Sequence, residues 1–149
     1  MKEVRPSLIK LINMLYRNTQ FYTDRALEKF HLSSGMYPYL LMLYENEGIS
    51  QNQISKELNV DKAMSARTIK KLIELDYIKK DVDTEDCRAY KLFLTDKSRE
   101  IIPEIKSEIH KWVYLITKDS SIEEQEIVID FLSKALTNAK EYKVNFGER

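Results

Sequence analysis

The chain contains little glycine, proline and cysteine, with three, three and one residues respectively among 149. Because tight turns depend on glycine and proline, their scarcity favours long helices with few loops and argues against a β-sandwich or barrel. The single cysteine, Cys87, excludes an intramolecular disulfide and fits a reducing compartment.

A net charge and a long hydrophobic run are also missing. The 24 basic and 24 acidic residues cancel, so any nucleic-acid binding must come from local clustering of positive charge. No stretch approaches about 18 apolar residues, and residues 1–16 lack the apolar core and cleavage site of a signal peptide. We therefore expect a cytoplasmic protein with no membrane partner.

Three long segments carry apolar residues at three- and four-residue steps, which predicts helices over about residues 6–30, 96–117 and 122–142. Thr95 or Asp96 would cap the second of these, and Pro103 inside it should either kink the helix or mark looser first two turns. Ser121 and Glu124 have the spacing of a capping box that opens the third. The apolar face predicted for the third helix is Ile127, Val128, Phe131, Leu132, Ala135, Leu136 and Ala139.

A shorter helix is predicted after the first one. Ser33 or Ser34 is a good N-cap for it, and it should run to about Glu47. Pro38 lies near its first turns, where a missing backbone N–H costs least. Gly48 follows as the expected left-handed C-cap.

Two short helices joined by a tight turn come next. Ser50 should cap a helix through about Leu58, residues 59–61 form the turn, and Asp61 should cap a helix to about Leu75. Residues 77–82 and 89–94 alternate as two strands around a polar tip at 83–87. A helix-turn-helix followed by a hairpin is a winged helix. We predict one domain over residues 1–149, mainly α with a small β component (α+β), with the winged helix at about 34–95 between long helices at about 6–31 and 96–142.

The second helix of this motif concentrates positive charge in an otherwise neutral chain. Between Lys62 and Ile73 there are four bases and no acid. With Ile69 at the centre of the buried side, the helical period places Ala66, Leu72 and Ile73 on that side. The opposite side then carries Met64, Arg67 and Lys71, flanked by Ala63, Thr68 and Lys70.

Such a helix has the chemistry of a DNA-contacting element. Its bases can neutralise phosphates and release condensed counterions, and the hydroxyls of Ser65 and Thr68 can add phosphate hydrogen bonds. Ala63 and Met64 would let the helix sit deep in the major groove. The predicted contacts of the helix pair are Gln51, Asn52, Lys62, Ala63, Met64, Ser65, Arg67, Thr68, Lys70 and Lys71. Two alternatives stay open: a solvated helix face, or a protein-interaction module whose bases meet an acidic partner without DNA binding.

Asp86 and Arg88 stand at the predicted hairpin tip. Two positions apart in a strand, their side chains leave the same face, so the carboxylate can orient the guanidinium. An oriented arginine there suits insertion into a narrow, electronegative minor groove. The alternative is an ordinary exposed ion pair, which contributes little free energy.

Over nearly its whole length the chain resembles the MarR family of transcriptional regulators. The matching segments read QNQISKEL at residues 51–58 and DKAMSARTIKKL at residues 61–72. The family's Asp-x-Arg wing motif falls on residues 86–88, and its Leu-Thr motif falls on Leu94-Thr95. Asp76 and Ser98 stand where the family commonly has glycine. Because Asp tolerates the left-handed conformation better than most residues, we expect the turn at Asp76 to survive.

The resemblance implies a homodimer that binds a double-stranded, pseudo-palindromic DNA operator and probes it with two recognition helices about one turn, roughly 34–36 Å, apart. It implies that Ser65, Arg67 and Thr68 lie in or beside the major groove and that Arg88 enters the minor groove. The apolar stripes of the flanking helices, which a small winged helix cannot cover, also favour a dimer. We expect a repressor.

Members of this family often bind a small aromatic or phenolic effector. Tyr16, Tyr37 and Tyr39 are candidates to line such a site, and Arg17 could meet a carboxylate. Tyr22 and Trp112 lie near the same elements. Aromatic residues at helical spacing are more often part of a core or a dimer interface, and that alternative stays open.

Metal, cofactor and enzyme chemistry lack sequence support. The two histidines, His31 and His110, have no ligand spacing, so we predict neither a metal nor another cofactor. The chain has no glycine-rich phosphate loop, no G-x-S-x-G motif and no metal-hydrolase motif, so we do not expect an enzyme. Cys87 reads as an incidental exposed thiol on the wing.

Overall fold

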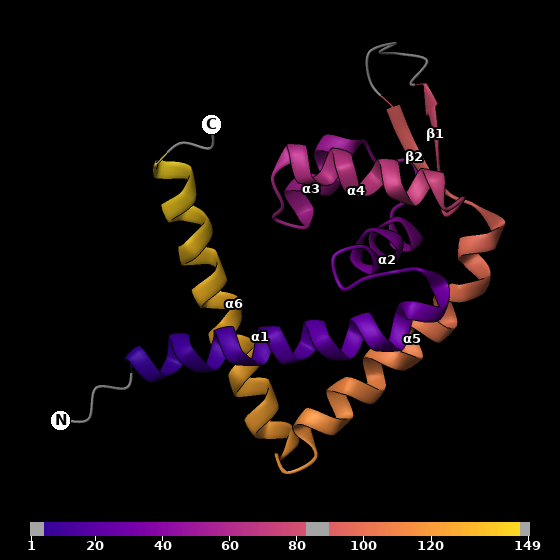
Figure 1. The fold of residues 1–149 in the computed structure, drawn as a ribbon. Coiled ribbons are helices and arrows are strands. Elements are labelled where there is room, and N and C mark those ends of the chain that lie inside the picture. The colour runs from indigo at the N-terminus through magenta and orange to yellow at the C-terminus, as the bar shows by residue number, and fades with distance from the viewer. Residues whose placement is uncertain (1–4, 83–89, 147–149) are drawn as a thin grey trace. The chain divides into compact units, whose positions relative to one another are not determined.

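The computed structural model describes residues 5–82 and 90–146 (Figure 1). In chain order they form α1 (Arg5–Leu27), the 3-10 helix η1 (Glu28–Phe30), α2 (Tyr37–Glu45), α3 (Gln51–Glu57), α4 (Lys62–Glu74), β1 (Ile78–Val82), β2 (Tyr90–Leu94), α5 (Asp96–Thr117) and α6 (Ile122–Asn145). This confirms the predicted mainly helical class with a hairpin directly after a helix pair. The chain divides into two compact units, Met1–Trp112 and Val113–Arg149.

The predicted helix starts at Ser50, Asp61 and Ser121 are confirmed. Ser50 and Ser121 each form a complete capping box, with Gln53 and Glu124 respectively, and the Asp61 carboxylate accepts from the Met64 amide at 2.8 Å. These caps accept hydrogen bonds from amides that have no partner within the first helical turn, so each helix begins at a defined residue. Thr95 likewise accepts from the Ser98 amide at 3.2 Å, and α5 then continues through Pro103 to Thr117.

The region before α3 differs from the prediction. Neither Ser33 nor Ser34 caps α2, because the Ser33 carbonyl accepts from the amides of Met36 and Tyr37 and closes a turn before the helix. Gly48 does adopt a left-handed φ of 83°, but α2 has already ended at Glu45. The Gly48 amide instead donates to the Leu92 carbonyl at 2.9 Å, which ties this loop to β2.

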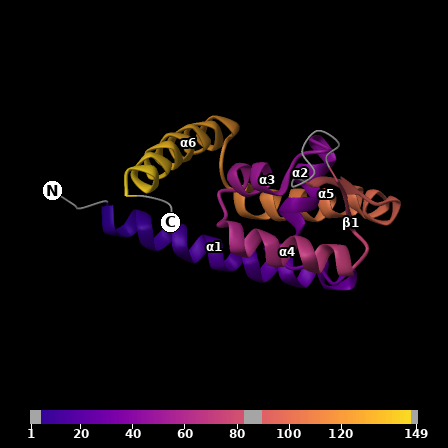
Figure 2. The same ribbon diagram turned by 90° about the horizontal axis from the view of Figure 1, so that it is seen from above.

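The core of the first unit lies under the winged helix. Its buried side chains come from α1 to α5, both strands and the loops between them, but not from η1: Leu27, Leu32, Met36, Tyr39, Leu40, Leu43, Ile54, Ile69, Leu72, Tyr77, Ile78, Leu92, Leu94, Ile102 and Ile105. In Figure 1, α2 lies below the α3–α4 pair and the β1–β2 hairpin projects from the end of that pair. Seen from above, α3 and α4 are separate, neighbouring rods (Figure 2). Burial of this common core holds the pair and the hairpin together.

The second unit consists of the end of α5 and α6. None of the residues of α6 is buried, and its predicted apolar face is exposed, with Ile127 at 68%, Phe131 at 47% and Leu132 at 43%. The N-terminal half of α1, in the first unit, is similar, since Leu11, Leu15 and Tyr16 are each at least half exposed. Among the described residues, no helix combines the length and the apolar character that crossing a membrane requires.

Candidate nucleic-acid interface

The inner face of α4 consists of Ser65, Ile69 and Leu72, at positions i, i+4 and i+7. The prediction that Ala66 lies on this face is wrong, because Ala66 is exposed and Ser65 is completely buried. The Ser65 hydroxyl makes a 2.9 Å hydrogen bond with the hydroxyl of Tyr39 on α2, which is only 2% exposed. This hydrogen bond satisfies the Ser65 hydroxyl and so allows a polar residue to occupy a buried position.

Ser65 therefore cannot contact DNA from this position, and that prediction is also wrong. A residue with 0% exposure presents no hydroxyl to a phosphate or to a base. The helical period alone could not tell which of the two adjacent residues, Ser65 or Ala66, is buried, because both are small. The partner hydroxyl that decides the matter lies 26 positions away on α2.

The outer face of α4 carries the other predicted contacts. Its exposed members are Lys62, Ala63, Met64, Arg67, Lys70 and Lys71. Thr68 is half-buried, and its hydroxyl donates to the Met64 carbonyl at 2.9 Å. On α3, Asn52 is exposed and Gln51 is half-buried.

The bases of this face are not in ion pairs with the acidic side chains that the structure describes. Within residues 5–82 and 90–146, no carboxylate forms an ion pair with Lys62, Arg67, Lys70 or Lys71. Their positive charges face solvent at one short helix of a neutral protein. A surface of this kind attracts a polyanion, since each phosphate that it neutralises releases counterions.

The stem of the hairpin adds bases that the sequence analysis did not single out. In the β1–β2 register, Lys79 faces Phe93, Lys80 faces Leu92 and Asp81 faces Lys91. The three lysines are exposed, and the Lys80 ammonium lies 4.6 Å from the centre of the Tyr90 ring. A count of bases beside the predicted tip could have found them. Asp86, Cys87 and Arg88 lie outside the described residues.

The turn between α4 and the hairpin is fixed by several long-range contacts. Asp76 adopts the expected left-handed φ, at 61°, and its carbonyl accepts from the Thr95 hydroxyl at 2.7 Å. The Tyr77 hydroxyl donates to the Phe30 carbonyl at 2.8 Å, and the Lys97 ammonium donates to the Leu75 carbonyl at 2.7 Å. These bonds attach the C-terminal end of α4 to η1 and α5.

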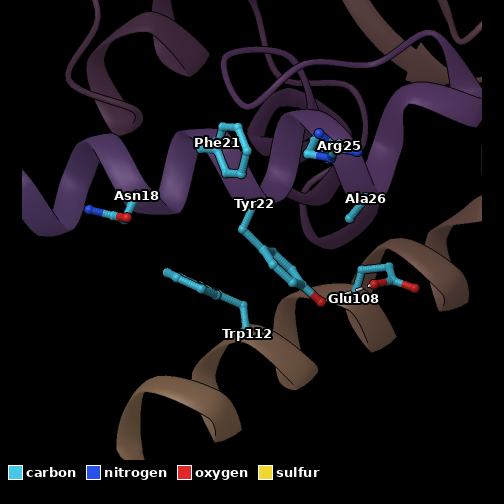
Figure 3. Close-up of a pocket in the computed structure, with 7 residues that line it drawn as sticks. All are labelled: Asn18, Phe21, Tyr22, Arg25, Ala26, Glu108 and Trp112. Atoms are coloured by element: carbon cyan, nitrogen blue, oxygen red, sulfur yellow. Dashed lines mark hydrogen bonds between the residues drawn. The ribbon is translucent and has the colours of Figure 1, made fainter.

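A pocket of about 480 Å³ lies between α1 and α5, within the first unit. Its lining residues are Asn18, Phe21, Tyr22, Arg25, Ala26, Glu108 and Trp112, and Figure 3 shows the rings of Tyr22 and Trp112 lying against each other. The two ring centroids are 4.8 Å apart, and the Trp112 indole N–H donates to Thr19 at 3.0 Å. The Arg25 guanidinium lies 5.6 Å from the centre of the Phe21 ring.

Two polar groups of the pocket are bonded to each other, since the Tyr22 hydroxyl donates to the Glu108 carboxylate at 3.2 Å. A hydrogen bond from Lys111 and, to a smaller extent, the hydrogen bond from Tyr22 hold the pKa of Glu108 below its ordinary value. Burial, reinforced by Glu108, raises the pKa of Tyr22. Near neutral pH the pocket therefore contains an ionised carboxylate and a protonated phenol.

None of the four predicted effector residues lines this pocket. Tyr16 and Arg17 are exposed on α1, and Tyr37 is half-buried, with a pKa raised by burial. Tyr39 is a core residue bonded to Ser65, so its prediction as an effector contact is wrong. Tyr22 and Trp112, which the sequence analysis placed near the same elements, are the aromatic residues that do line it. Among the described residues, no cluster of His, Cys, Asp and Glu could hold a metal ion.

Comparison with known proteins identifies the family. The model of the MarR family matches residues 32–90. The HTH-type transcriptional regulator BilQ of Clostridioides difficile (strain CD3) is 37% identical over 123 residues, which cover 82% of this chain and 83% of the relative. A solved MarR protein from Peptoclostridium difficile DA00132 superposes with a TM-score of 0.90 at 27% identity and covers 99% of this chain and 94% of that one.

The fold is shared with a structure that contains DNA. A putative MarR-family regulator from Listeria monocytogenes, solved in complex with a 26mer DNA, has a TM-score of 0.87 at 24% identity over 100% of this chain and 98% of that one. The family and the named relatives are transcriptional regulators and not enzymes, in agreement with the sequence analysis. The chain belongs to the MarR family of winged-helix transcriptional regulators.

Proposed function

We propose that this regulator is a cytoplasmic homodimer that represses transcription from a pseudo-palindromic operator and is released from it by a small aromatic effector. Each protomer contributes α4 to a major groove and the wing, with Arg88, to the adjacent minor groove. The whole chain acts as one dimerising domain. DNA contacts come from Gln51, Asn52, Lys62, Ala63, Met64, Arg67, Thr68, Lys70 and Lys71, with Asp86 orienting Arg88.

The exposed outer face of α4 is the observation that carries this proposal. It combines bases that form no ion pair with any carboxylate in residues 5–82 and 90–146 with small or flexible side chains, Ala63 and Met64, that allow close approach to base edges. Met64 remains 49% exposed although it is a large apolar residue. The Listeria neighbour, whose structure contains DNA, has the same fold.

The dimer is supported by exposed apolar surface on α1 and α6. A face that includes Phe131, Leu132 and Leu136 at 43–48% exposure is unusual on a helix that meets only water. A second copy of the chain would bury it, and two-fold symmetry would pair two recognition helices with two half-sites.

The effector is proposed to bind in the α1–α5 pocket. Its volume of about 480 Å³ is suitable for a small aromatic molecule, and Phe21, Tyr22 and Trp112 offer aromatic surface. Arg25 offers a positive charge for an acidic group on the ligand.

The DNA proposal is tested by fluorescence anisotropy with the DNA upstream of the chain's own gene, titrated at several salt concentrations. We expect log Kd to rise steeply with log salt, and Lys71→Ala to reduce that slope by about one unit per protomer because a phosphate contact is lost. Lys118→Ala, in the turn after α5, removes an equal charge and should leave the slope unchanged. If no duplex binds at low salt, the protein-interaction alternative replaces the proposal.

The effector proposal is tested with 4-hydroxybenzoate as the probe. Trp112 is the only tryptophan in the chain, so its emission reports on the pocket directly. We expect saturable quenching together with release of DNA, and loss of both in Arg25→Ala. Arg17→Ala, on the same helix but outside the pocket, is the control. Quenching that survives in Arg25→Ala would contradict the assigned pocket.

A further inference from the structure

The hydrogen bond between Tyr39 and Ser65 joins two helices through the middle of the core. The two hydroxyl oxygens are 2.9 Å apart, and the residues are 2% and 0% exposed. Tyr39 belongs to α2, which carries none of the proposed DNA contacts. Ser65 belongs to the second turn of α4, directly beside Met64 and close to Arg67.

The position of Ser65 determines which way the outer face of α4 points. Successive residues of a helix are about 100° apart, so a rotation that moved Ser65 out of the core would swing Met64 and Arg67 away by the same angle. Ile69 and Leu72 resist such a rotation only through apolar packing, which is not directional. A hydrogen bond has a preferred distance and angle, so it defines the rotation more narrowly.

We propose that Tyr39 is a positioning residue for sequence reading: its hydroxyl, through Ser65, sets the rotation of α4 and thereby the alignment of Met64 and Arg67 with base edges. This inference rests on the proposed DNA binding. Phosphate contacts come from long, flexible lysines and tolerate a small rotation, whereas base contacts depend on geometry. Loss of the bond should therefore reduce discrimination between DNA sequences more than it reduces binding to DNA in general.

The test uses the full-length chain and two duplexes: one selected by the wild-type protein from a random library, and a scrambled duplex of equal composition. Kd is measured on both at a temperature where circular dichroism shows every variant folded. The Kd ratio is Kd on the scrambled duplex divided by Kd on the selected duplex. In Tyr39→Phe we expect this ratio to fall about 10-fold, comparable to the loss of one base contact, with Kd on the scrambled duplex unchanged.

Tyr77→Phe is the matched control. It removes the hydroxyl of another buried tyrosine, 3% exposed, whose 2.8 Å bond to the Phe30 carbonyl lies beyond the C-terminal end of α4. It should lower the melting temperature while leaving the Kd ratio unchanged. An equal fall of the ratio in Tyr77→Phe would mean that general destabilisation explains the effect, and it would overturn the proposal.

The double variant Tyr39→Phe/Ser65→Ala separates positioning from stability. Ser65→Ala alone leaves the Tyr39 hydroxyl buried without its partner, whereas the double variant removes both polar groups and should recover melting temperature. We expect its Kd ratio to stay low. A ratio restored to the wild-type value in the double variant, or unchanged in Tyr39→Phe, refutes the positioning role. If the wild-type chain selects no sequence, the proposed function fails, and the inference fails with it.

Discussion

Two amphipathic helices of this chain, α4 and α6, place their apolar residues in opposite environments. In α4, Ile69 and Leu72 are buried within the chain, and half of the residues that remain exposed are basic. In α6 no residue is buried, and Phe131 and Leu132 face outward. A helix whose exposed face is charged is suited to a polyanion, and a helix whose exposed face is apolar is suited to another protein surface. In the proposed function, the first surface meets DNA and the second meets another copy of the chain.

The largest expected effect comes from placing a charge on the apolar face of α6. Leu132→Asp would put an unpaired carboxylate into the proposed dimer interface, so sedimentation velocity at micromolar concentration should show a monomer. Operator affinity should fall by more than about 100-fold because the half-sites are then bound separately. Ser133→Asp, one position away and off the apolar face, should remain dimeric, as should Arg67→Glu on α4. A dimeric Leu132→Asp variant would show that this face of α6 does not form the dimer interface.

A smaller effect is expected from the wing. Arg88→Ala should weaken operator binding about 10-fold and flatten its salt dependence, because a cation is lost from the minor groove. Anisotropy titrations at several salt concentrations measure both. The oligomeric state should not change, because Arg88 is not part of the proposed dimer interface. An unchanged dependence of log Kd on log salt would contradict the proposed contact of Arg88 with DNA.

The smallest effect is expected at the C-terminal end of α4. Asp76 has a left-handed φ of 61°, which is unfavourable for a residue with a side chain, so Asp76→Gly should stabilise the fold by about 0.5–1 kcal/mol. The carbonyl that accepts from Thr95 is retained. Gly48→Ala, at a φ of 83°, should change stability in the opposite direction. Thermal unfolding at fixed protein concentration measures both, and a destabilised Asp76→Gly would show that the aspartate side chain stabilises this turn.

Local signals predicted the elements well. Ser50, Asp61 and Ser121 were identified as caps because a cap depends on residues within one helical turn. Asp76 was expected to keep a left-handed turn for a similarly local reason, its own short polar side chain. The start of α2 was missed because the Ser33 carbonyl closes a turn there, and two adjacent serines gave no signal to distinguish a turn from a cap.

Contacts between residues far apart in the sequence were harder to predict. The pocket combines Tyr22 of α1 with Glu108 and Trp112 of α5, and no spacing in the sequence relates these positions. Tyr39 was assigned to an effector site because aromatic type and approximate position were the only guides. The structure buries it instead, bonded to a serine on another helix.

The class of the protein can be predicted from local patterns in the sequence. The order of the helices, the hairpin after the helix pair and the concentration of bases on α4 follow from periodicity, caps and charge, which are properties of neighbouring residues. The packed fold is needed to see which face of α4 is buried, which aromatic residues line a pocket and which apolar faces remain uncovered. Those outcomes depend on what each side chain meets across the fold, and such partners are brought together by packing rather than by proximity along the chain.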